Sequence, residues 1–417
     1  MAHHENIITG LDIGSSYIRA VVLKSSGQEG SLEIIGAAEK QSQGIAKGMI
    51  TDIEDAVSSI SEVLEQLERM TGYPVESAVV GISGTHIKTL ESTGVVAVAK
   101  ADKEITEEDV ERAIEAAQAV ATPPNHEILH VIPRDFTVDN QTGIKDPVGM
   151  NGVRLEVSTQ IIIGLSSQIK NLTKSIYRTG VDINDLVFGV LASSESVLDK
   201  KQKELGVALV NIGSQITTLI VYEEGDILHT AVLPLGSSHI TSDIAIGLRT
   251  SVEAAEIIKL EIAEANSKKI GKRDEIDLAK FSDRENERTM VSVKQICDIV
   301  QPRAEEIFTL VDQELKEINR SGLLPAGIVL TGGGSKLNGF VELAKDKFKL
   351  PVVIGVPHGF AEIAIDKVND PSFTTALGLA LWGSQGTYKS SKFNLPNFSS
   401  VDDAVDKMKN WFKSLLP

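Results

Sequence analysis

The pattern of apolar and polar positions divides the chain into alternating strands and amphipathic helices. Residues 53–70 carry apolar side chains at helical spacing, and Gly72 and Pro74 then end the segment, which predicts a helix with one face in a core. The unbroken apolar run at residues 75–82 is typical of a buried strand, and helical spacing returns at residues 166–179. Alternating elements of this kind indicate an α/β fold.

Two glycine-centred hairpins repeat one pattern in the two halves of the chain. Residues 10–16 read GLDIGSS, and residues 210–215 read VNIGSQ. Each segment follows an apolar strand and leads into another. A glycine in such a turn lets backbone N–H groups approach phosphate oxygens, and Asp12 at its edge can reach Mg²⁺ through a water ligand. The repeat predicts two phosphate-binding clasps, the first clasp being Asp12, Gly14, Ser15 and Ser16 and the second clasp being Asn211, Gly213, Ser214 and Gln215.

A third glycine-rich segment follows the apolar strand at residues 327–331. Gly332, Gly333 and Gly334 allow the backbone to approach a flat ligand, and Lys336 lies just beyond them. The chain contains neither G-x-x-x-x-G-K-[ST] nor a well-placed G-x-G-x-x-G, so the other common nucleotide motifs are set aside. Paired clasps followed by such a strand end resemble the actin-like ATPase superfamily, in which two similar domains close on ATP.

Residues 83–164 interrupt the first domain with short strands around one helix, which Thr106 is expected to cap at its N-terminus. Three stretches in and around this module, residues 84–87, 128–133 and 143–154, resemble FtsA, the bacterial cell-division actin homologue, whose extra subdomain occupies this place. The resemblance covers essentially the whole chain.

The resemblance implies a duplicated actin-like ATPase fold with two domains facing a nucleotide cleft, an inserted FtsA-type subdomain and a C-terminal amphipathic helix. The expected division is residues 1–82 and 165–193 for the first core domain, 83–164 for the insert, 194–244 and 301–383 for the second core domain, 245–300 for a small outer subdomain, 384–400 for a flexible linker and 401–417 for the terminal helix.

Further roles follow from the resemblance. Ser194 and Glu195 lie in the segment that joins the domains and that orients the attacking water in actin-like folds, while a solvated helix face would also explain Glu195. Glu256 and Lys259 would lie near ribose and adenine, although their spacing alone makes them an i, i+3 ion pair. Asn211 replaces the acidic residue usual in the second clasp, so ATP binding is better supported than ATP hydrolysis.

Residues 401–417 predict a helix with an apolar and aromatic face, separated from the core by a polar linker. The side chains expected to enter a membrane interface, with one flanking lysine, are Val405, Met408, Trp411, Phe412, Lys413, Leu415 and Leu416. FtsA proteins end in the same way. The alternative is a terminal helix that packs on the protein's own core.

As an FtsA relative, the chain is expected to use ATP and Mg²⁺, to polymerise with itself and to meet other division proteins. It is also expected to hold the C-terminal tail of FtsZ, the tubulin-like ring protein, at the cytoplasmic face of the cell membrane at the division site, on an anionic membrane surface. Arg288, Lys294 and Arg303 are the positions proposed for the acidic groups of FtsZ.

Composition narrows the alternatives. The net charge of −17 argues against nucleic-acid binding, and the single cysteine, Cys297, excludes disulfides within the chain. No secretory signal and no apolar run of about 20 residues occurs, so we expect a cytoplasmic protein. The H-E-x-x-H pattern at residues 126–130 binds zinc on a helix, whereas the prolines on both sides favour a strand.

Three other classes of actin-fold protein remain as alternative interpretations. A small-molecule kinase would need a catalytic base between the domains, where Asp185 is the one nearby carboxylate and fits a turn. A PilM-like pilus-assembly scaffold would not need the linker and the amphipathic tail. A chaperone would need a peptide-binding domain, for which the chain has no room.

Overall fold

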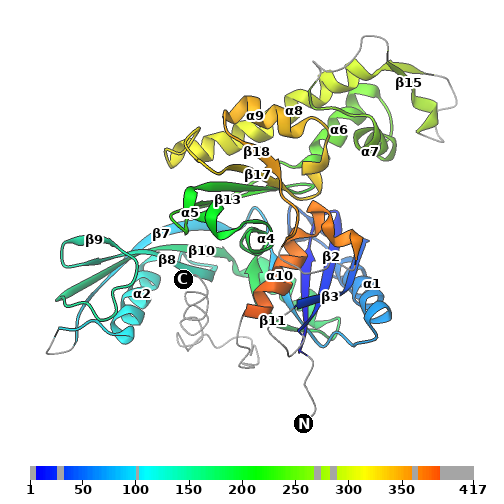
Figure 1. Cartoon of the computed structure of the whole chain (residues 1–417). Coiled ribbons are helices and arrows are strands. Elements are labelled where there is room, and N and C mark those ends of the chain that lie inside the picture. The colour runs from blue at the N-terminus through cyan, green and yellow to red at the C-terminus, as the bar shows by residue number, and fades with distance from the viewer. Residues whose placement is uncertain are drawn as a thin grey trace.

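The computed structural model describes residues 6–25, 32–99, 103–266, 274–281, 289–358 and 365–385. Figure 1 shows two α/β domains, one above the other, with a further sheet projecting sideways from the lower one. Among the helices described, none combines the length and the apolar character that crossing a bilayer requires.

The first domain is built on a five-stranded sheet in the order β11-β6-β1-β2-β3. β1 pairs antiparallel with β2 and β2 with β3, while β6 and β11 run parallel to β1. The strands are β1 (Asn6–Ile13), β2 (Tyr17–Ser25), β3 (Leu32–Gln41), β6 (Ser77–Ile82) and β11 (Asp182–Phe188). The predicted strand at 75–82 is therefore confirmed as β6.

Helices cover both faces of this sheet, and β2 shows how. Ile18 and Val22 belong to the same buried cluster as α1 (Ile53–Thr71) and α3 (Ser166–Tyr177), whereas Val21 and Leu23 pack with α10 (Thr374–Gln385) on the other face. Asp52 caps the N-terminus of α1 by accepting a hydrogen bond from the Asp55 N–H, and Gly72 at φ 75° ends it. The helix predicted at 53–70 is thus confirmed.

The second domain repeats the first. Its sheet has the order β14-β13-β12-β17-β18, with β12 central, two antiparallel strands on one side and two parallel strands on the other. The strands are β12 (Val207–Ile212), β13 (Thr217–Glu223), β14 (Asp226–Leu233), β17 (Gly327–Thr331) and β18 (Val352–Ile354), and the helices of this half are α6 (Ser237–Leu248), α7 (Val252–Glu261), α8 (Val293–Glu317) and α9 (Phe340–Phe348). A short ladder of β15 (Glu275–Asp277) and β16 (Met290–Ser292) lies at its outer end (Figure 1).

The chain returns to the first domain at its end. The range 301–383 was expected to complete the second domain, yet α10 packs on the first sheet and against α4 (Gly189–Val197). A Cβ on Gly10 would lie 2.2 Å from the Ala376 carbonyl oxygen, and one on Gly378 would lie 1.8 Å from that of Ala192. Residues 374–383 are apolar almost all round because both sides of the helix are buried.

The insert is an antiparallel sheet in the order β7-β10-β8-β9, covered by α2. Its elements are β7 (Lys88–Ala97), α2 (Glu107–Ala121), β8 (His126–Val138), β9 (Gln141–Ile144) and β10 (Arg154–Leu165). Thr106 caps α2 as predicted, and its hydroxyl accepts a hydrogen bond from the Asp109 N–H. The H-E-x-x-H segment lies in β8 as expected, and the His130 ring accepts a hydrogen bond from the Phe188 N–H.

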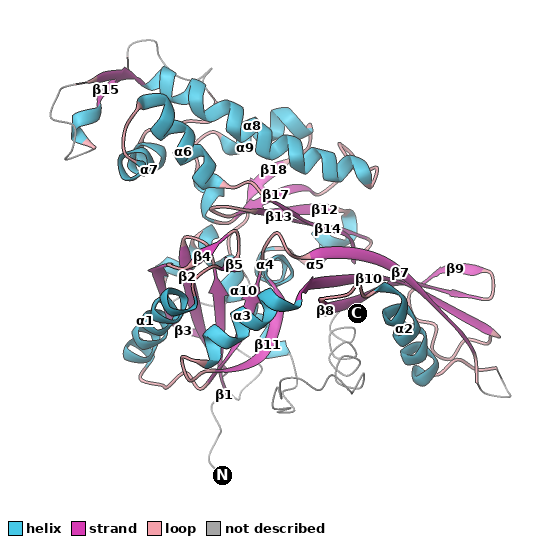
Figure 2. Cartoon of the chain, turned by 180° about the vertical axis from the view of Figure 1, so that it is seen from behind, coloured by secondary structure: helices cyan, strands magenta, loops and turns pink. Residues whose placement is uncertain are grey.

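The insert also touches the second domain, along the edge strand β14. The Thr89 and Thr230 hydroxyls lie 2.6 Å apart, the Gln160 amide donates to the Leu228 carbonyl oxygen, and Lys145 forms an ion pair with Asp226. Figure 2 shows β7 and β10 running beneath β14. The insert therefore bridges both halves of the molecule.

Candidate nucleotide-binding site

The two clasps are built alike, strand for strand. In the first hairpin Asp12 pairs with Arg19, and in the second Asn211 pairs with Thr218, so Asp12 and Asn211 hold equivalent positions. A Cβ on Gly14 would lie 2.5 Å from the carbonyl oxygen three residues on, and a Cβ on Gly213 would lie 2.9 Å from its counterpart. Both turns thus require glycine, which keeps the backbone open to a ligand.

The clasps meet across the gap between the domains. The Ser16 hydroxyl donates to the Ser214 hydroxyl oxygen at 2.6 Å. The turn between β4 (Ile45–Ala46) and β5 (Met49–Ile50) joins both clasps, because the Lys47 N–H donates to the Gln215 side-chain oxygen and the Gly48 N–H donates to the Ser15 hydroxyl oxygen. The sequence analysis missed this turn, for which Gly48 was the one available signal.

The N-terminus of α6 abuts the second clasp. The Ser237 N–H donates to the Gly213 carbonyl oxygen at 2.9 Å, and the Ser238 N–H donates to that of Ser214 at 2.8 Å. A Cβ on Gly236 would lie 2.5 Å from the Ser214 carbonyl oxygen, so glycine is needed for this approach. The N-terminus of α6, which is the positive end of the helix dipole, is therefore fixed against the second clasp.

The third glycine segment closes the site from β17. Gly332 has φ +81°, and a Cβ there would lie 2.2 Å from the Asn211 side-chain oxygen. A Cβ on Gly334 would lie 2.7 Å from the Ile212 side chain, whereas the nearest atom to a Cβ on Gly333 is 3.8 Å away. The Lys336 ammonium group pairs with Asp370 at 2.6 Å.

Asp12 is the acidic group of the site. Burial raises the pKa of its carboxyl from 3.8 to about 6, and the positive charge of Arg19 acts in the opposite direction. A bound cation would relieve this desolvation. Mg²⁺ is commonly held by one or two carboxylates together with waters and phosphate oxygens, so a single carboxylate beside two phosphate clasps fits Mg²⁺ carried in with a nucleotide.

Asn211 faces the hinge between the domains. Its amide nitrogen donates to the Ser193 hydroxyl oxygen at 3.0 Å and to the Thr375 hydroxyl oxygen at 3.1 Å. These partners come from α4 and α10, the two helices that link the halves of the molecule. Both amide hydrogens are therefore in use inside the protein.

The structure does not bring Ser194 and Glu195 to the clasps. The buried Ser194 hydroxyl bonds to the Leu191 carbonyl oxygen and to the Tyr222 hydroxyl. Thr218 is the residue of β13 that pairs with Asn211, and Tyr222 lies four residues beyond it. Glu195 pairs with Lys203 of α5 (Lys200–Leu205) at 2.7 Å. Consecutive residues of a helix point about 100° apart, and the residue of α4 that reaches the second clasp is Ser193, which the sequence analysis missed.

Glu256 and Lys259 form the ion pair that their spacing predicts. The Lys259 ammonium group lies 2.7 Å from Glu256, and the hydroxyl of Thr241 bonds to both at 2.5 and 2.9 Å. Thr241 stands one turn into α6, whose first residues touch the second clasp. This places the pair on the same side of the site as that clasp.

Of the residues predicted to bind partners or the membrane, two lie in the described part of the chain. Arg303 makes a bidentate ion pair with Asp243 of α6, its closer contact being 2.6 Å. Lys294 is exposed near the start of α8. Arg288 and the membrane-binding set at 405–416 lie outside the described residues.

Two solved structures show the class of fold. The chain matches one chain of the PilM–PilN type IV pilus biogenesis complex with a TM-score of 0.66, at 18% identity, over 91% of this chain and 99% of that one. It matches MreB5 of Spiroplasma citri bound to AMPPNP with a TM-score of 0.52, at 12% identity, over 90% and 96% of the two chains. The duplicated sheets and facing clasps are thus those of an actin-like ATPase fold.

Sequence comparison narrows the class to one family. The model for cell division protein FtsA matches residues 208–378, and the model for the SHS2 domain inserted in FtsA matches residues 84–163, close to the predicted insert at 83–164. The cell division protein FtsA of Pseudomonas aeruginosa is 38% identical over 410 residues, which is 97% of each chain. The chain belongs to the FtsA family of bacterial cell-division proteins.

Proposed function

We propose that this chain binds Mg-ATP between its two domains, polymerises, and tethers FtsZ filaments to the inner face of the cytoplasmic membrane at the division septum. The observation that carries the proposal is the direct contact of the two clasps through Ser16 and Ser214, with three glycine turns and the α6 N-terminus around them. Every group a triphosphate needs meets at one place: open backbone, hydroxyl donors, a helix dipole and one carboxylate.

Nucleotide turnover should be slow. The equivalent of Asp12 in the second clasp is Asn211, which carries no charge and spends its amide hydrogens on Ser193 and Thr375. Without a carboxylate here, polarisation of an attacking water would depend on groups elsewhere in the site. ATP would then act mainly as the ligand that holds the two domains together.

The outer part of the second domain offers a surface for the FtsZ tail. Ile246, Val252 and Leu260 of α6 and α7 are 77%, 59% and 63% exposed. Arg303 lies on the neighbouring α8, paired with Asp243 of α6. The apolar side chains of a bound peptide would bury Ile246, Val252 and Leu260. Its carboxylates would compete with Asp243 for Arg303.

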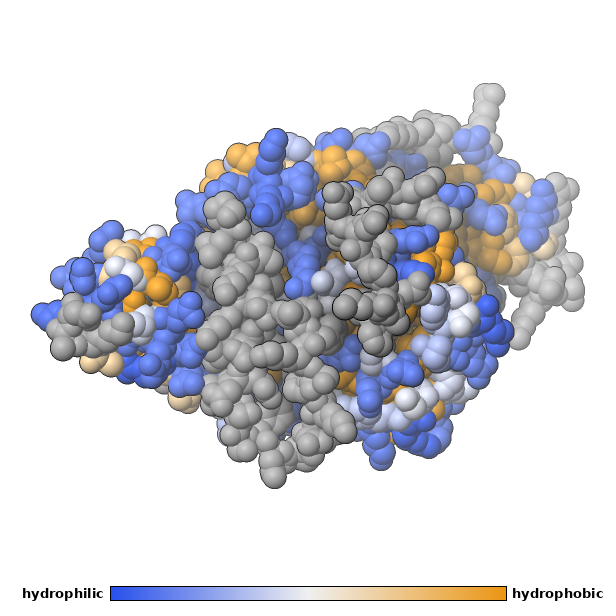
Figure 3. Space-filling model, turned by 60° about the horizontal axis from the view of Figure 1, so that its bottom comes forward, coloured by the Kyte–Doolittle hydropathy of each residue, from blue (hydrophilic) through white to orange (hydrophobic). Residues whose placement is uncertain are grey.

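Self-association is assigned to the insert, which projects from the body of the molecule. Val148 and Val153, in the connection between β9 and β10, are exposed. Figure 3 shows apolar side chains at this projecting end. Burial of such side chains against another copy would support a longitudinal contact in a filament.

Membrane attachment is assigned to residues 401–417. The three lysines of this segment are balanced by Asp402, Asp403 and Asp406, so attraction to anionic lipid is small even at about 1 kcal/mol for each lysine. A single short helix would hold a monomer weakly. Helices linked in a filament would raise one another's effective concentration, so attachment should depend on polymerisation.

Cosedimentation tests the proposal. Purified protein with ATP, anionic liposomes and FtsZ should pellet with both, and Trp411→Glu with Phe412→Glu should abolish pelleting with liposomes while leaving binding of a fluorescent ATP analogue unchanged. Unchanged pelleting after removal of residues 401–417 would refute the membrane role. A protein that binds ATP yet stays monomeric on lipid and ignores FtsZ would favour a scaffold of the PilM kind.

A further inference from the structure

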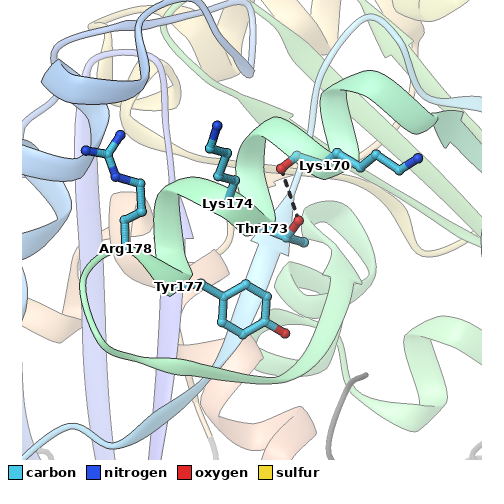
Figure 4. A pocket seen from close by; sticks show the side chains of 5 residues that line it. All are labelled: Lys170, Thr173, Lys174, Tyr177 and Arg178. Carbon is cyan, nitrogen blue, oxygen red and sulfur yellow. Dashed lines mark hydrogen bonds between the residues drawn. The ribbon is translucent and has the colours of Figure 1, made fainter. Parts of the chain in front are cut away.

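The outer side of α3 carries a groove of about 410 Å³ that the nucleotide site does not use. Its lining residues, Lys170, Thr173, Lys174, Tyr177 and Arg178, follow one stripe of the helix at spacings of three and four residues. Figure 4 shows the side chains of Lys174 and Arg178 rising on one side of α3, while the Tyr177 ring points to the other.

The groove combines apolar walls with unused polar groups. The Tyr177 hydroxyl is buried, and no described residue offers it a hydrogen bond. Lys170 and Lys174 are exposed and form no ion pair with any described residue, whereas Arg178 is held by both carboxylate oxygens of Glu54. An occupant should therefore supply apolar side chains for the walls and carboxylates for the two lysines.

Residues 401–417 of the same chain supply both. Their apolar face includes Val405 and Met408, and Asp402, Asp403 and Asp406 lie at the end of the segment nearest the linker. The acidic first part of this segment would face the two lysines, and its apolar residues would face the apolar walls of the groove. An anionic lipid surface would also satisfy the lysines, but the tail is tethered to the same domain and is therefore present at a higher effective concentration.

The tail is long enough to reach the groove. The last turn of α10 is fixed to β11, because the Trp382 indole donates to the Asp185 carboxylate at 3.2 Å. α3 leads directly into β11, so the groove and the start of the tail lie beside the same edge strand. The 15 residues between 385 and 401 span up to about 50 Å when extended, which is ample for that path.

We propose that the groove on α3 docks residues 401–417 in the monomer, so that the tail lies either on its own first domain or in the membrane. This inference rests on the proposed function for the role of the released tail. Docking within one chain benefits from a high effective concentration, so weak contacts are enough to hold the tail. A filament on lipid would shift the balance toward the membrane, because its linked tails bind there together.

Charge reversal at the groove tests the proposal through the direction of the effect. Lys170→Glu with Lys174→Glu removes two exposed ion pairs to the tail, and nucleotide-free monomer should then bind vesicles of phosphatidylcholine and phosphatidylglycerol about fivefold more tightly. Lys200→Glu with Lys201→Glu on α5 makes the same charge change away from the groove and should bind as the wild type does. Weaker vesicle binding by the groove variant would show that Lys170 and Lys174 contact lipid directly. Unchanged binding would show that these lysines do not hold the tail. Either result overturns the proposal.

A charge swap and a cross-link test the contact itself. Adding Asp402→Lys and Asp406→Lys to the groove variant should restore wild-type vesicle binding. A bismaleimide should join Lys174→Cys to Met408→Cys within one monomer but leave Lys200→Cys and Met408→Cys unjoined, and the native Cys297 is buried. If neither the rescue nor the cross-link is seen, the docking proposal is overturned, and pelleting of the wild type with vesicles would still support the membrane role. If the cross-link forms but the wild type does not pellet with vesicles, the docking stands and the membrane role is wrong.

Discussion

Replacing Asp12 by asparagine should weaken Mg-ATP binding and yet stabilise the nucleotide-free protein. Asp12 is half-buried at the end of β1, and desolvation raises the pKa of its carboxyl from 3.8 to about 6 despite the nearby charge of Arg19. The charged form is thus less favourable in the folded protein than in the unfolded chain. Asparagine has nearly the same shape and removes that charge.

The size of the effect follows from the two pKa values. The folded protein binds the proton more tightly, so its stability falls as pH rises between 3.8 and about 6, and the whole penalty is present above that window. Linkage gives a penalty of about 3 kcal/mol at pH 7.5 and about 1.6 kcal/mol at pH 5. The advantage of Asp12→Asn over the wild type should therefore shrink by about 1.4 kcal/mol between these conditions.

Urea unfolding followed by tryptophan fluorescence measures this difference. Trp382 lies in α10 on the first sheet, and a Trp411→Phe background leaves it as the sole indole reporter. Titration of a fluorescent ATP analogue with and without Mg²⁺ measures the loss of binding in the same variant. An advantage that is equal at pH 5 and pH 7.5 would refute the raised pKa of Asp12, and unimpaired Mg²⁺-dependent binding would remove Asp12 from the metal site.

Two further substitutions test the packing that supports the site. Gly378→Ala places a Cβ 1.8 Å from the Ala192 carbonyl oxygen and should destabilise the protein by about 1–3 kcal/mol in urea unfolding. The control Gly333→Ala, whose Cβ has 3.8 Å of clearance, should leave stability unchanged. Equal effects of the two substitutions would contradict a tight crossing of α4 and α10. Lys203→Met leaves the partly buried Glu195 unpaired and should lower the free energy of unfolding by about 3 kcal/mol. The double variant with Glu195→Met should recover most of that loss. No recovery would mean that the broken ion pair does not cause the loss of stability.

Local sequence patterns predicted most of the fold, because the clasps and the long helices depend on neighbouring residues. The insert was predicted to contain short strands, but its strands are long. β10 runs over 154–165, whereas the apolar and polar alternation at residues 153–157 alone predicts a strand of about five residues. Ser158, Thr159 and Gln160 interrupt the apolar pattern, yet the Thr159 hydroxyl and the Gln160 amide nitrogen donate to the backbone carbonyls of Ser92 and Leu228. Polar residues with distant partners are invisible to a search for apolar runs.

The site shows the same limit. The glycine turns were found because each turn is coded by consecutive residues. The contacts of Lys47 with Gln215 and of Ser193 with Asn211 join residues 168 and 18 positions apart, and tertiary packing alone brings them together. The choice between Ser193 and Ser194 is a matter of helical phase, which the position of α4 against the second sheet decides. Partners set by packing could not be read from spacing.

Packing also gives a reason for Asn211 itself. The two connections between the domains meet in a buried set of hydroxyls, in which Ser193 bonds to Thr375 and Thr331 bonds to Thr374. Asn211 supplies that set with two N–H donors from the end of β12, beside the second clasp. A carboxylate there has no donors, so the hydroxyls would have to reverse their hydrogen bonds around a buried charge. Asn211 is thus the residue that ties the second clasp to α4 and α10, and its amide fits this set of hydroxyls better than a carboxylate would.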